Sequence, residues 1–388
     1  MNLLARHRRY LGALVAGFFG LLLLSNIIPD PVGGWKARTP IDPGWGFMQK
    51  AGAVLRNAPA FMQDNFGFRA TMPALRRAVR SALGAPDTTP IYAGRDGRLF
   101  WAMELTPEQS AGAVVRAAAV ARFATMIGVM QRELAPLGTK VVVALPPNAQ
   151  SVEVEALPAW TDLLRYPVTE YGMALDALRA EGVAAVDLRP ALREAPAPRY
   201  LHTDTHWNTR SSVLAFNAVM AAAGHPLWRV DPAEVVGPPE PMARGDLLRS
   251  MRMPPEIDDE NFKIQLPPRA GKGRADPALA HPNVHPLFAS LAWDYAPTGA
   301  RVLILGDSFT NGLWPRLFVN AQVSVVGWMH ASRTVMGACD FNFDDVRRFK
   351  PDLLIYARTE RYFVCPPSAW PVGLRQPDPG AIPAGAVP

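Results

Sequence analysis

Apolar residues recur along the chain in short continuous runs, and longer segments with helical periodicity lie between them. Such runs suit strands that are buried on both faces of a sheet. The expected strands are 140–145, 183–188, 301–305, 323–326 and 352–356. The expected helices are 107–137, 171–181, 209–223 and 344–349, and residues 91–101 indicate a hairpin around a Gly-Arg-Asp-Gly turn. This alternation predicts an α/β fold with a mostly parallel sheet flanked by helices.

The first residues of the chain have the pattern of a membrane-spanning segment. Arg6, Arg8 and Arg9 precede an uncharged, mainly apolar run from Tyr10 to Ile28. As a helix this run is about 28 Å long, close to the thickness of the hydrocarbon layer. Because basic flanks stay in the cytoplasm, we expect residues 1–28 to be a transmembrane anchor and the rest of the chain to lie outside the cytoplasm. A cleaved signal peptide is the alternative.

Composition divides the rest of the chain into three parts. Residues 29–60 are rich in Pro, Gly and Trp and are expected to form a juxtamembrane linker. Residues 61–365 are expected to form the folded domain, within which 225–295 hold many prolines and are predicted as an irregular insertion. Residues 366–388 are expected to be a poorly ordered, Pro-rich tail.

The overall composition narrows the possible functions. Of the 388 residues, 49% are hydrophobic and 19% are charged, which supports a sizeable core and excludes global disorder. Two cysteines are too few for a multi-cysteine zinc or iron–sulfur site. The net charge of +6 comes from scattered basic residues, so it gives only weak support for an anionic partner, and no nucleic-acid partner is expected.

The sharpest chemical signal is the sequence Gly306-Asp307-Ser308, which follows directly after the apolar run 302–305. The glycine permits a tight exit turn, and Ser308 is then expected at the carboxyl edge of the sheet, where such folds place a nucleophile. The alternative is a serine that only caps the following helix.

A second signal is the block from Leu201 to Asn208, just before a predicted helix. Asp204 and His206 are two residues apart in an extended segment, so they face the same side. A serine nucleophile needs a base, and the base needs an orienting carboxylate. Asp204, His206 and Ser308 therefore form a candidate triad. A capping aspartate beside a surface histidine is the alternative.

Metal binding is a different interpretation of the same block, because His202, Asp204 and His206 alternate on one face. No clear fourth ligand accompanies them. His281 and His285 are separated by a proline and lie in the predicted insertion. No metal ion is expected.

These two blocks, taken together, resemble those of a known family. The strand followed by Gly-Asp-Ser resembles the nucleophile block of SGNH/GDSL hydrolases, in which Asp and His usually come after the serine. An Asp-x-His-Trp block upstream of Gly-Asp-Ser is similar to the permuted arrangement of the alginate O-acetyltransferase family, in particular its membrane-anchored periplasmic branch. The resemblance covers roughly residues 60–365, and further stretches agree with it: 64–69, 91–101, 244–249 and 360–362.

The resemblance implies a role for each candidate residue. Ser308 is the nucleophile, His206 the general base and later acid, and Asp204 the residue that orients His206. The backbone N–H of Ser308 is one donor of the oxyanion hole. Asn148 and Arg333 follow predicted strands at the same edge and are further oxyanion candidates, with turn capping and surface solvation as their alternatives.

The resemblance also implies a function and a location. The expected protein is a single-pass inner-membrane protein whose catalytic domain lies in the periplasm and acetylates hydroxyls of a secreted polysaccharide through a Ser308 acetyl-enzyme. No soluble cofactor is needed, and the acetyl donor is a multi-pass membrane O-acyltransferase. Two alternatives stay open: a polysaccharide deacetylase or esterase with the same triad, and a non-catalytic assembly factor of an exopolysaccharide export complex.

Cys339 and Cys365 are both expected outside the cytoplasm. An oxidising compartment favours a disulfide between them. Two separate buried thiols are the alternative.

Overall fold

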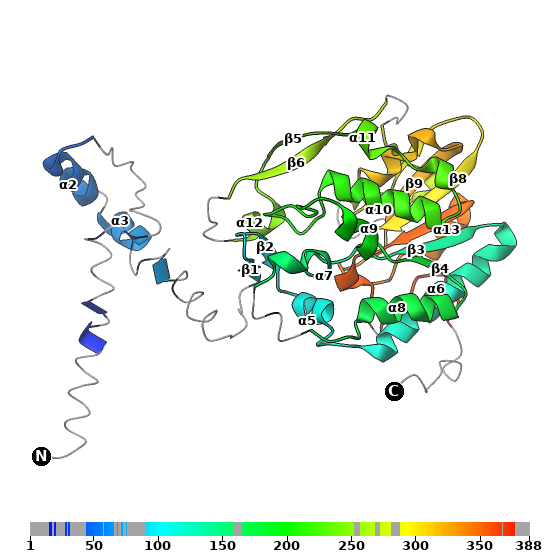
Figure 1. Cartoon of the computed structure of the whole chain (residues 1–388), viewed down its shortest axis with the longest axis horizontal. Coiled ribbons are helices and arrows are strands. Elements are labelled where there is room, and N and C mark those ends of the chain that lie inside the picture. The colour runs from blue at the N-terminus through cyan, green and yellow to red at the C-terminus, as the bar shows by residue number, and fades with distance from the viewer. Residues whose placement is uncertain are drawn as a thin grey trace, which may run out of the picture. The chain divides into compact units, whose positions relative to one another are not determined.

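The computed structural model describes most of the chain from residue 90 onward and parts of the chain before it. The described residues are 15–17, 19–20, 28, 30–31, 44–56, 58–65, 68, 71–72, 75, 90–158, 161, 165–251, 257–267, 272–280, 288–366 and 368–376. The chain divides into two compact units, Met1–Asp87 and Thr88–Pro388 (Figure 1). In the first unit the described helices include α2 (Phe47–Arg56) and α3 (Ala58–Asn65), so the segment 29–60, expected to be a linker, contains helical structure.

The expected membrane anchor is contradicted. No helix in the described part of the chain is long and apolar enough to cross a bilayer, which needs about 20 consecutive residues. Of the predicted anchor, residues 1–28, the described positions are 15–17, 19, 20 and 28, and the rest lies outside the described residues. The single-pass inner-membrane location inferred from that segment is corrected accordingly.

The second unit is built on a mixed sheet. Its strands are β3 (Lys140–Ala144), β4 (Ala184–Val186), β7 (Leu291–Asp294), β8 (Ala300–Gly306), β9 (Val323–His330) and β10 (Leu353–Ala357). They form a six-stranded sheet in the order β4-β3-β10-β8-β9-β7. All neighbours are parallel except β7, which runs antiparallel to β9 at the edge. The predicted α/β fold with a mostly parallel sheet is confirmed.

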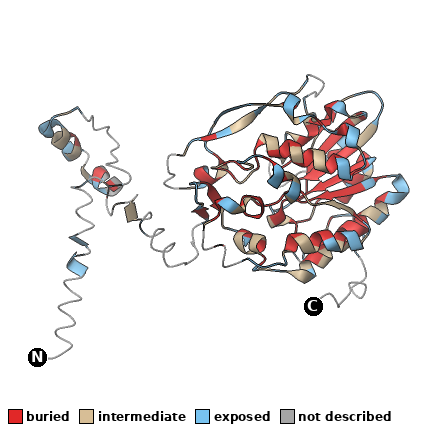
Figure 2. Cartoon of the chain, viewed as in Figure 1, coloured by how far each residue is buried: buried red, intermediate tan, exposed pale blue. Residues whose placement is uncertain are grey.

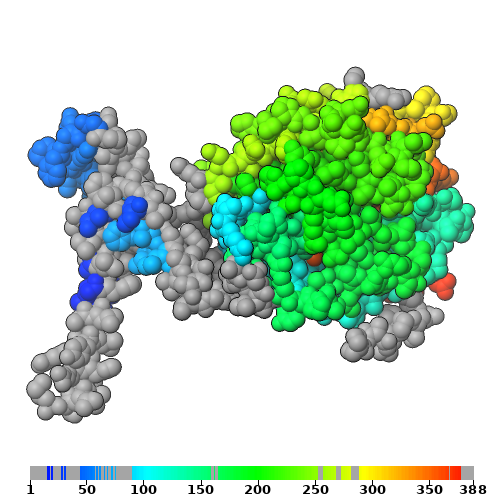
Figure 3. Space-filling view, viewed as in Figure 1, coloured from blue at the N-terminus to red at the C-terminus, as the bar shows by residue number. Residues whose placement is uncertain are grey.

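Helices cover both faces of this sheet. The described helices of this unit are α5 (Thr106–Ala111), α6 (Ala117–Leu134), α7 (Ala149–Val152), α8 (Glu170–Ala180), α9 (Arg189–Glu194), α10 (Thr209–Ala222), α11 (Pro232–Val235), α12 (Asp246–Ser250) and α13 (Phe343–Phe349). Of these, α6, α8 and α13 pack on one face and α10 on the other, while α12 packs against Ile91 and Leu99. Side chains alternate between the two faces along a strand. In β3, Val141 and Val143 therefore pack with α6, α8 and α13 on one face, and Val142 and Ala144 pack with α10 on the other. Figure 2 shows the buried strands between the two helical layers, and Figure 3 shows that the middle of the chain, in green, covers much of the face turned to the viewer.

Two predicted elements differ from the structure. The single helix expected over 107–137 is interrupted after α5, where Gly112 has φ 75° and a Cβ would lie 2.3 Å from the carbonyl oxygen of Val168. The residues 225–295, expected to be irregular, contain α11, α12, edge strand β7 and an antiparallel pair, β5 (Val236–Met242) and β6 (Asp259–Ile264). The hairpin expected over 91–101 is confirmed as β1 (Ile91–Ala93) and β2 (Leu99–Trp101).

The segment after the last strand is held to the domain. The backbone N–H of Phe343 donates to the carbonyl oxygen of Val372 at 2.8 Å, so part of the expected tail packs beside α13. Residues 377–388 lie outside the described residues. A disulfide joins Cys339 and Cys365, whose Cα atoms are 5.5 Å apart and whose side chains are buried. It links the loop after β9 to the segment after β10.

Replacing both cysteines by serine is expected to lower the free energy of unfolding by about 2–4 kcal/mol, because the unfolded chain regains the freedom that the closed loop removes. Urea unfolding of the wild type and the double variant, each oxidised and reduced, measures this effect. A loss of stability in the variant that equals the loss on reducing the wild type supports it. Identical midpoints for the oxidised wild type and the variant would contradict it.

Candidate active site

The candidate nucleophile Ser308 lies just beyond the carboxyl end of β8, a strand with neighbours on both sides. β8 ends at Gly306, where a Cβ would lie 2.2 Å from Thr310 Oγ1 and 3.1 Å from Trp328 Nε1. The φ of Gly306 is not in the left-handed region. The glycine is therefore required by close packing, and not by the tight exit turn that the sequence suggested.

Asp307 fixes the turn that carries Ser308. Its carboxylate accepts hydrogen bonds from the backbone N–H and the hydroxyl of Thr359, at 2.7 and 2.6 Å, and from the backbone N–H of Phe309 at 3.0 Å. The loops after β8 and β10 are thereby tied together. The backbone N–H of Ser308 donates to no residue within the described part of the chain.

Asp204 and His206 lie in the loop before α10. Asn208 caps this helix, because its side chain accepts a hydrogen bond from the backbone N–H of Ser211. The Trp207 indole N–H donates to the carbonyl oxygen of Phe309 at 3.1 Å. The loop with the candidate base is therefore attached directly to the turn with the candidate nucleophile.

This attachment brings His206 between Asp204 and Ser308. His206 Nδ1 is 2.6 Å from Asp204 Oδ1, and His206 Nε2 is 2.8 Å from Ser308 Oγ. With Nδ1–H donating to the carboxylate, Nε2 presents its lone pair to the hydroxyl, the tautomer that can accept a proton from a serine. The structure thus brings all three residues of the candidate triad together.

The Asp204 carboxyl is buried, with 8% of the residue exposed. Burial raises the pKa of this carboxyl. The hydrogen bond and charge of His206 and the backbone N–H groups of Asp246 and His206 lower it by more, so that the net pKa is about 2. Asp204 is therefore ionised at neutral pH. An ionised carboxylate at this position holds the proton on Nδ1 and stabilises the imidazolium form of His206.

The start of α12 holds Asp204 from the other side. The backbone N–H of Asp246 donates to Asp204 Oδ2 at 2.8 Å, and its carboxylate accepts from the Thr205 hydroxyl at 2.6 Å. This approach requires Gly245, where a Cβ would lie 2.6 Å from Asp204 Cβ and 2.3 Å from the Thr203 carbonyl oxygen.

Sequence reasoning gave no role to two of these supporting residues, Asp246 and Asp259. The Asp259 carboxylate accepts from the backbone N–H and the hydroxyl of Thr203, at 2.8 and 2.7 Å. Both acids come from the segment predicted as irregular, so no regular pattern marked them. The one available signal was the Gly-Asp pair in the stretch 244–249.

Ligand atoms of Asp204, His206 and Asp246 also lie within 4.8 Å of one another, a grouping that can hold a metal ion. Both ring nitrogens of His206 are engaged, however, one with Asp204 and one with the candidate nucleophile. His202, part of the alternating metal pattern, lies 3.9 Å from an aspartate of the β1–β2 hairpin instead. Two other histidines considered as ligands lie outside the described residues, His281 and His285.

The two further oxyanion candidates are placed differently. Asn148 follows β3, which β10 separates from β8, and its side-chain amide donates to Ser110 Oγ at 3.0 Å. Arg333 follows β9, the neighbour of β8, and its backbone N–H donates to an aspartate at 2.7 Å. Among the described contacts, no hydrogen bond or ion pair joins either residue to Ser308.

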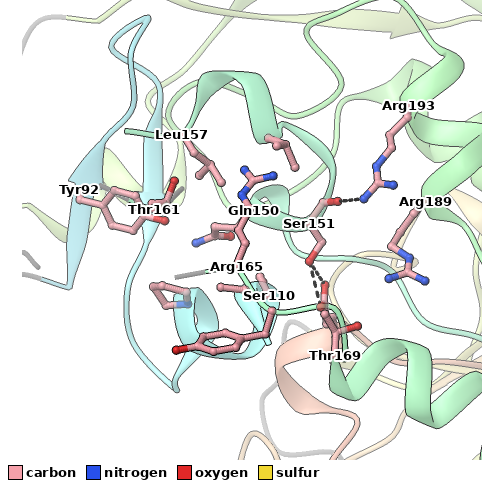
Figure 4. A pocket seen from close by; sticks show the side chains of 15 residues that line it. Tyr92, Ser110, Gln150, Ser151, Leu157, Thr161, Arg165, Thr169, Arg189 and Arg193 are labelled. Atoms are coloured by element: carbon pink, nitrogen blue, oxygen red, sulfur yellow. Dashed lines mark hydrogen bonds between the residues drawn. The ribbon is translucent and has the colours of Figure 1, made fainter. Parts of the chain in front are cut away.

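A cavity of about 180 Å³, lined by both polar and apolar side chains, lies beside the carboxyl ends of β3 and β10 (Figure 4). Its walls include Ser151, Arg193 and Glu360, and none of the candidate triad. Ser151 donates to the Glu360 carboxyl at 2.7 Å, and Arg193 donates to the Ser151 carbonyl oxygen at 2.6 Å. Burial raises the pKa of Glu360 to about 7, although hydrogen bonds from Asn148 and Ser151 oppose the shift.

The raised pKa of Glu360 predicts a pH-dependent stability. The folded protein holds this proton more tightly than the unfolded chain, whose carboxyl has the ordinary pKa of 4.5. Ionisation therefore weighs against the fold, and stability should fall by about 3 kcal/mol as the pH rises from 4.5 to 7. Glu360→Gln should remove this slope, as measured by urea unfolding across the pH range.

Glu181→Gln is the matched control, because Glu181 lies at the surface in an ion pair with Arg132. It should keep the wild-type slope. If Glu360→Gln also kept the slope, the buried carboxyl would not be its source.

The α/β fold places Gly-Asp-Ser at the end of a central strand and the Asp-x-His loop beside it, the two blocks on which the sequence resembles SGNH hydrolases. Residues 91–259 match the family described as SGNH hydrolase-like domain, acetyltransferase AlgX. This match spans under half of the chain and ends before the Gly-Asp-Ser block. It confirms the resemblance to the alginate O-acetyltransferase family and supports an O-acetyltransferase.

Several solved structures resemble the chain at low identity. The O-acetyltransferase domain of Pseudomonas putida AlgJ is 19% identical, with 75% of this chain and 96% of that chain covered and a TM-score of 0.47. Bacillus cereus PatB1 is 13% identical, with 71% and 97% covered and a TM-score of 0.46. Pseudomonas aeruginosa AlgX is 13% identical, with 70% and 64% covered and a TM-score of 0.45. No curated protein matches the chain.

Proposed function

We propose that the protein transfers acetyl groups to hydroxyls of a secreted polysaccharide through an acetyl ester of Ser308. The family match supports the acetyltransferase class. The observation that carries the mechanism is the contact of 2.8 Å between His206 Nε2 and Ser308 Oγ, with His206 Nδ1 on the ionised Asp204.

In the first half of the reaction, Ser308 Oγ attacks the acetyl carbonyl carbon while His206 Nε2 takes the hydroxyl proton. The oxygen of the tetrahedral intermediate becomes negative, and the backbone N–H of Ser308, which has no acceptor in the described structure, is its proposed donor. Asn148 and Arg333 remain proposed further donors. His206 then protonates the leaving oxygen of the donor, and the acetyl group stays on Ser308.

In the second half, a sugar hydroxyl attacks the acetyl-enzyme. His206 Nε2 takes the proton of that hydroxyl and returns a proton to Ser308 Oγ as the bond to serine breaks. Water in place of the sugar would make the same site an esterase, so transfer depends on how the acceptor is held and on how water is excluded. A multi-pass membrane O-acyltransferase is the proposed acetyl donor.

Loss of the triad is expected to abolish acetyl chemistry. Ser308→Ala and His206→Ala should each lower acetyl release from p-nitrophenyl acetate by about a thousandfold or more, and Asp204→Asn by about a hundredfold or more, because the base then loses its orienting charge. The full chain is assayed with and without oligosaccharide, and acetylated sugar is detected by mass spectrometry.

Ser324→Ala is the matched control, since Ser324 lies at the amino end of β9, at the edge of the sheet opposite to Ser308. It should retain the wild-type rate. Equal rates for Ser308→Ala and the wild type would overturn the proposal. Ser308-dependent release of acetate without any acetylated sugar, even with excess oligosaccharide, would replace the transferase by an esterase.

A further inference from the structure

A group of polar and aromatic side chains outside the candidate triad surrounds one carboxylate, that of Glu104. Glu104 lies in the loop between β2 and α5, Trp101 ends β2, and Arg361 and Tyr362 lie in the turn after β10. Trp101 Nε1 donates to Glu104 Oε2 at 2.8 Å, and the Tyr362 hydroxyl donates to Glu104 Oε1 at 3.0 Å. We call these four residues the Glu104 cluster. Each carboxylate oxygen keeps capacity for a further donor.

Arg361 connects this cluster to the candidate catalytic residues. Its guanidinium lies over the ring of Phe309, 5.4 Å from the centroid. The same Phe309 ring is 4.7 Å from the imidazole of His206 and directly follows Ser308 in the chain. The Glu104 cluster is therefore separated from the proposed acetyl-enzyme by a single aromatic side chain.

The loop that carries Glu104 has an unusual backbone. Glu104 and Leu105 both have φ of 60°, in the left-handed region that residues other than glycine rarely adopt. Met103 and Leu105 are 49% and 45% exposed, so burial of their side chains does not account for the conformation. Strained backbone of this kind gathers at sites that must aim a side chain. Here it turns the Glu104 carboxylate towards Trp101, Arg361 and Tyr362.

The chemistry of the cluster suits a sugar ring. The Glu104 carboxylate, on a side chain that is 37% exposed, accepts hydrogen bonds from hydroxyl groups, while the nearly buried Arg361 guanidinium lies beside it. The rings of Trp101 and Tyr362 offer apolar faces with a polar edge. Only 8% of the Arg361 side chain is exposed, so its position is set before a ligand arrives.

The charges favour an uncharged sugar. Arg361 Nε lies 4.0 Å from Glu104 Oε2, so the cation is already balanced by an anion. The carboxylate of a uronic acid would have to share this guanidinium with Glu104 and would meet a like charge. The acids around His206, which are Asp204 and Asp246, add further negative charge next to Phe309.

We propose that the Glu104 cluster is the acceptor subsite, which binds an uncharged pyranose unit and presents one of its hydroxyls to the acetyl group on Ser308. This inference rests on the proposed function and names the substrate class of the same site. Uncharged polysaccharides are then better acceptors than polyuronates.

The first test compares two acceptors on the full chain. With p-nitrophenyl acetate as donor, acetylated sugar and free acetate are quantified with cellohexaose or with hexamannuronate. The ratio of acetylated sugar to acetate should be at least about fivefold higher for cellohexaose, because only the uronate meets the like charge of Glu104. An equal ratio, or a higher ratio for hexamannuronate, would overturn the inference.

The second test changes the carboxylate. Glu104→Gln should lower the transfer-to-acetate ratio with cellohexaose about tenfold and raise the KM for this sugar, the effect expected for losing a charge-assisted hydrogen bond. Glu181→Gln, a surface carboxylate remote in sequence and in an ion pair with Arg132, is the matched control and should keep both values. If Glu104→Gln lowered acetate release and sugar transfer in equal proportion, the role of Glu104 would be merely structural. This result would overturn the inference.

The third test is independent of acetyl chemistry. Calorimetric titration of cellohexaose into the full-chain Ser308→Ala protein should detect binding, which should be lost in the Ser308→Ala, Glu104→Gln double variant. This result would support the subsite even if the wild type showed no transferase activity. A Ser308→Ala protein that does not bind cellohexaose, or a double variant that binds it equally well, would overturn the subsite while leaving the triad to its own assay.

Discussion

The buried carboxylate of Asp204 is the group on which the arrangement of the site depends. It accepts hydrogen bonds from the ring and the backbone of His206 and from the backbone of Asp246. A buried carboxylate with fewer donors would be costly, so the loop before α10 and the start of α12 must both be in place for the imidazole to be held. The glycine at position 245 is what lets the two segments approach so closely.

The same logic extends across the carboxyl edge of the sheet. The loop after β10 is held by Asp307 on one side and contacts the segment after β3 on the other, where Glu360 accepts from Asn148 and Ser151. Its last residues, Arg361 and Tyr362, then reach the loop after β2. Carboxylates that accept hydrogen bonds from backbone N–H and hydroxyl groups of neighbouring loops thus connect these loops to one another.

Much of this architecture was predictable where the information is local. After the charged first residues Lys140 and Arg301, the runs 141–145 and 302–305 are apolar because their strands are buried on both faces. Ser308 could be placed because Gly306-Asp307-Ser308 directly follows such a run. The other features depend on tertiary packing, which the local sequence does not show. β5 contains three prolines, which argue against a strand, yet it pairs with β6 in a two-stranded sheet where all of its residues are exposed or half-buried. The roles of Asp246 and Glu104 depend on contacts with segments far away in sequence, and the apolar N-terminal run led to an anchor that the structure does not support.

The contact between His206 and Ser308 joins residues 102 positions apart, and the contact between Ser151 and Glu360 joins residues 209 positions apart. Contacts this distant along the chain form only after large loops have closed, which makes folding slow. The permuted order of the motifs places the base before the nucleophile and the final sheet strand, β10, after both. During synthesis the Asp-x-His loop therefore emerges well before the strands that orient it. Enzymatic competence should consequently be one of the last properties to appear during folding, later than helix content or compactness.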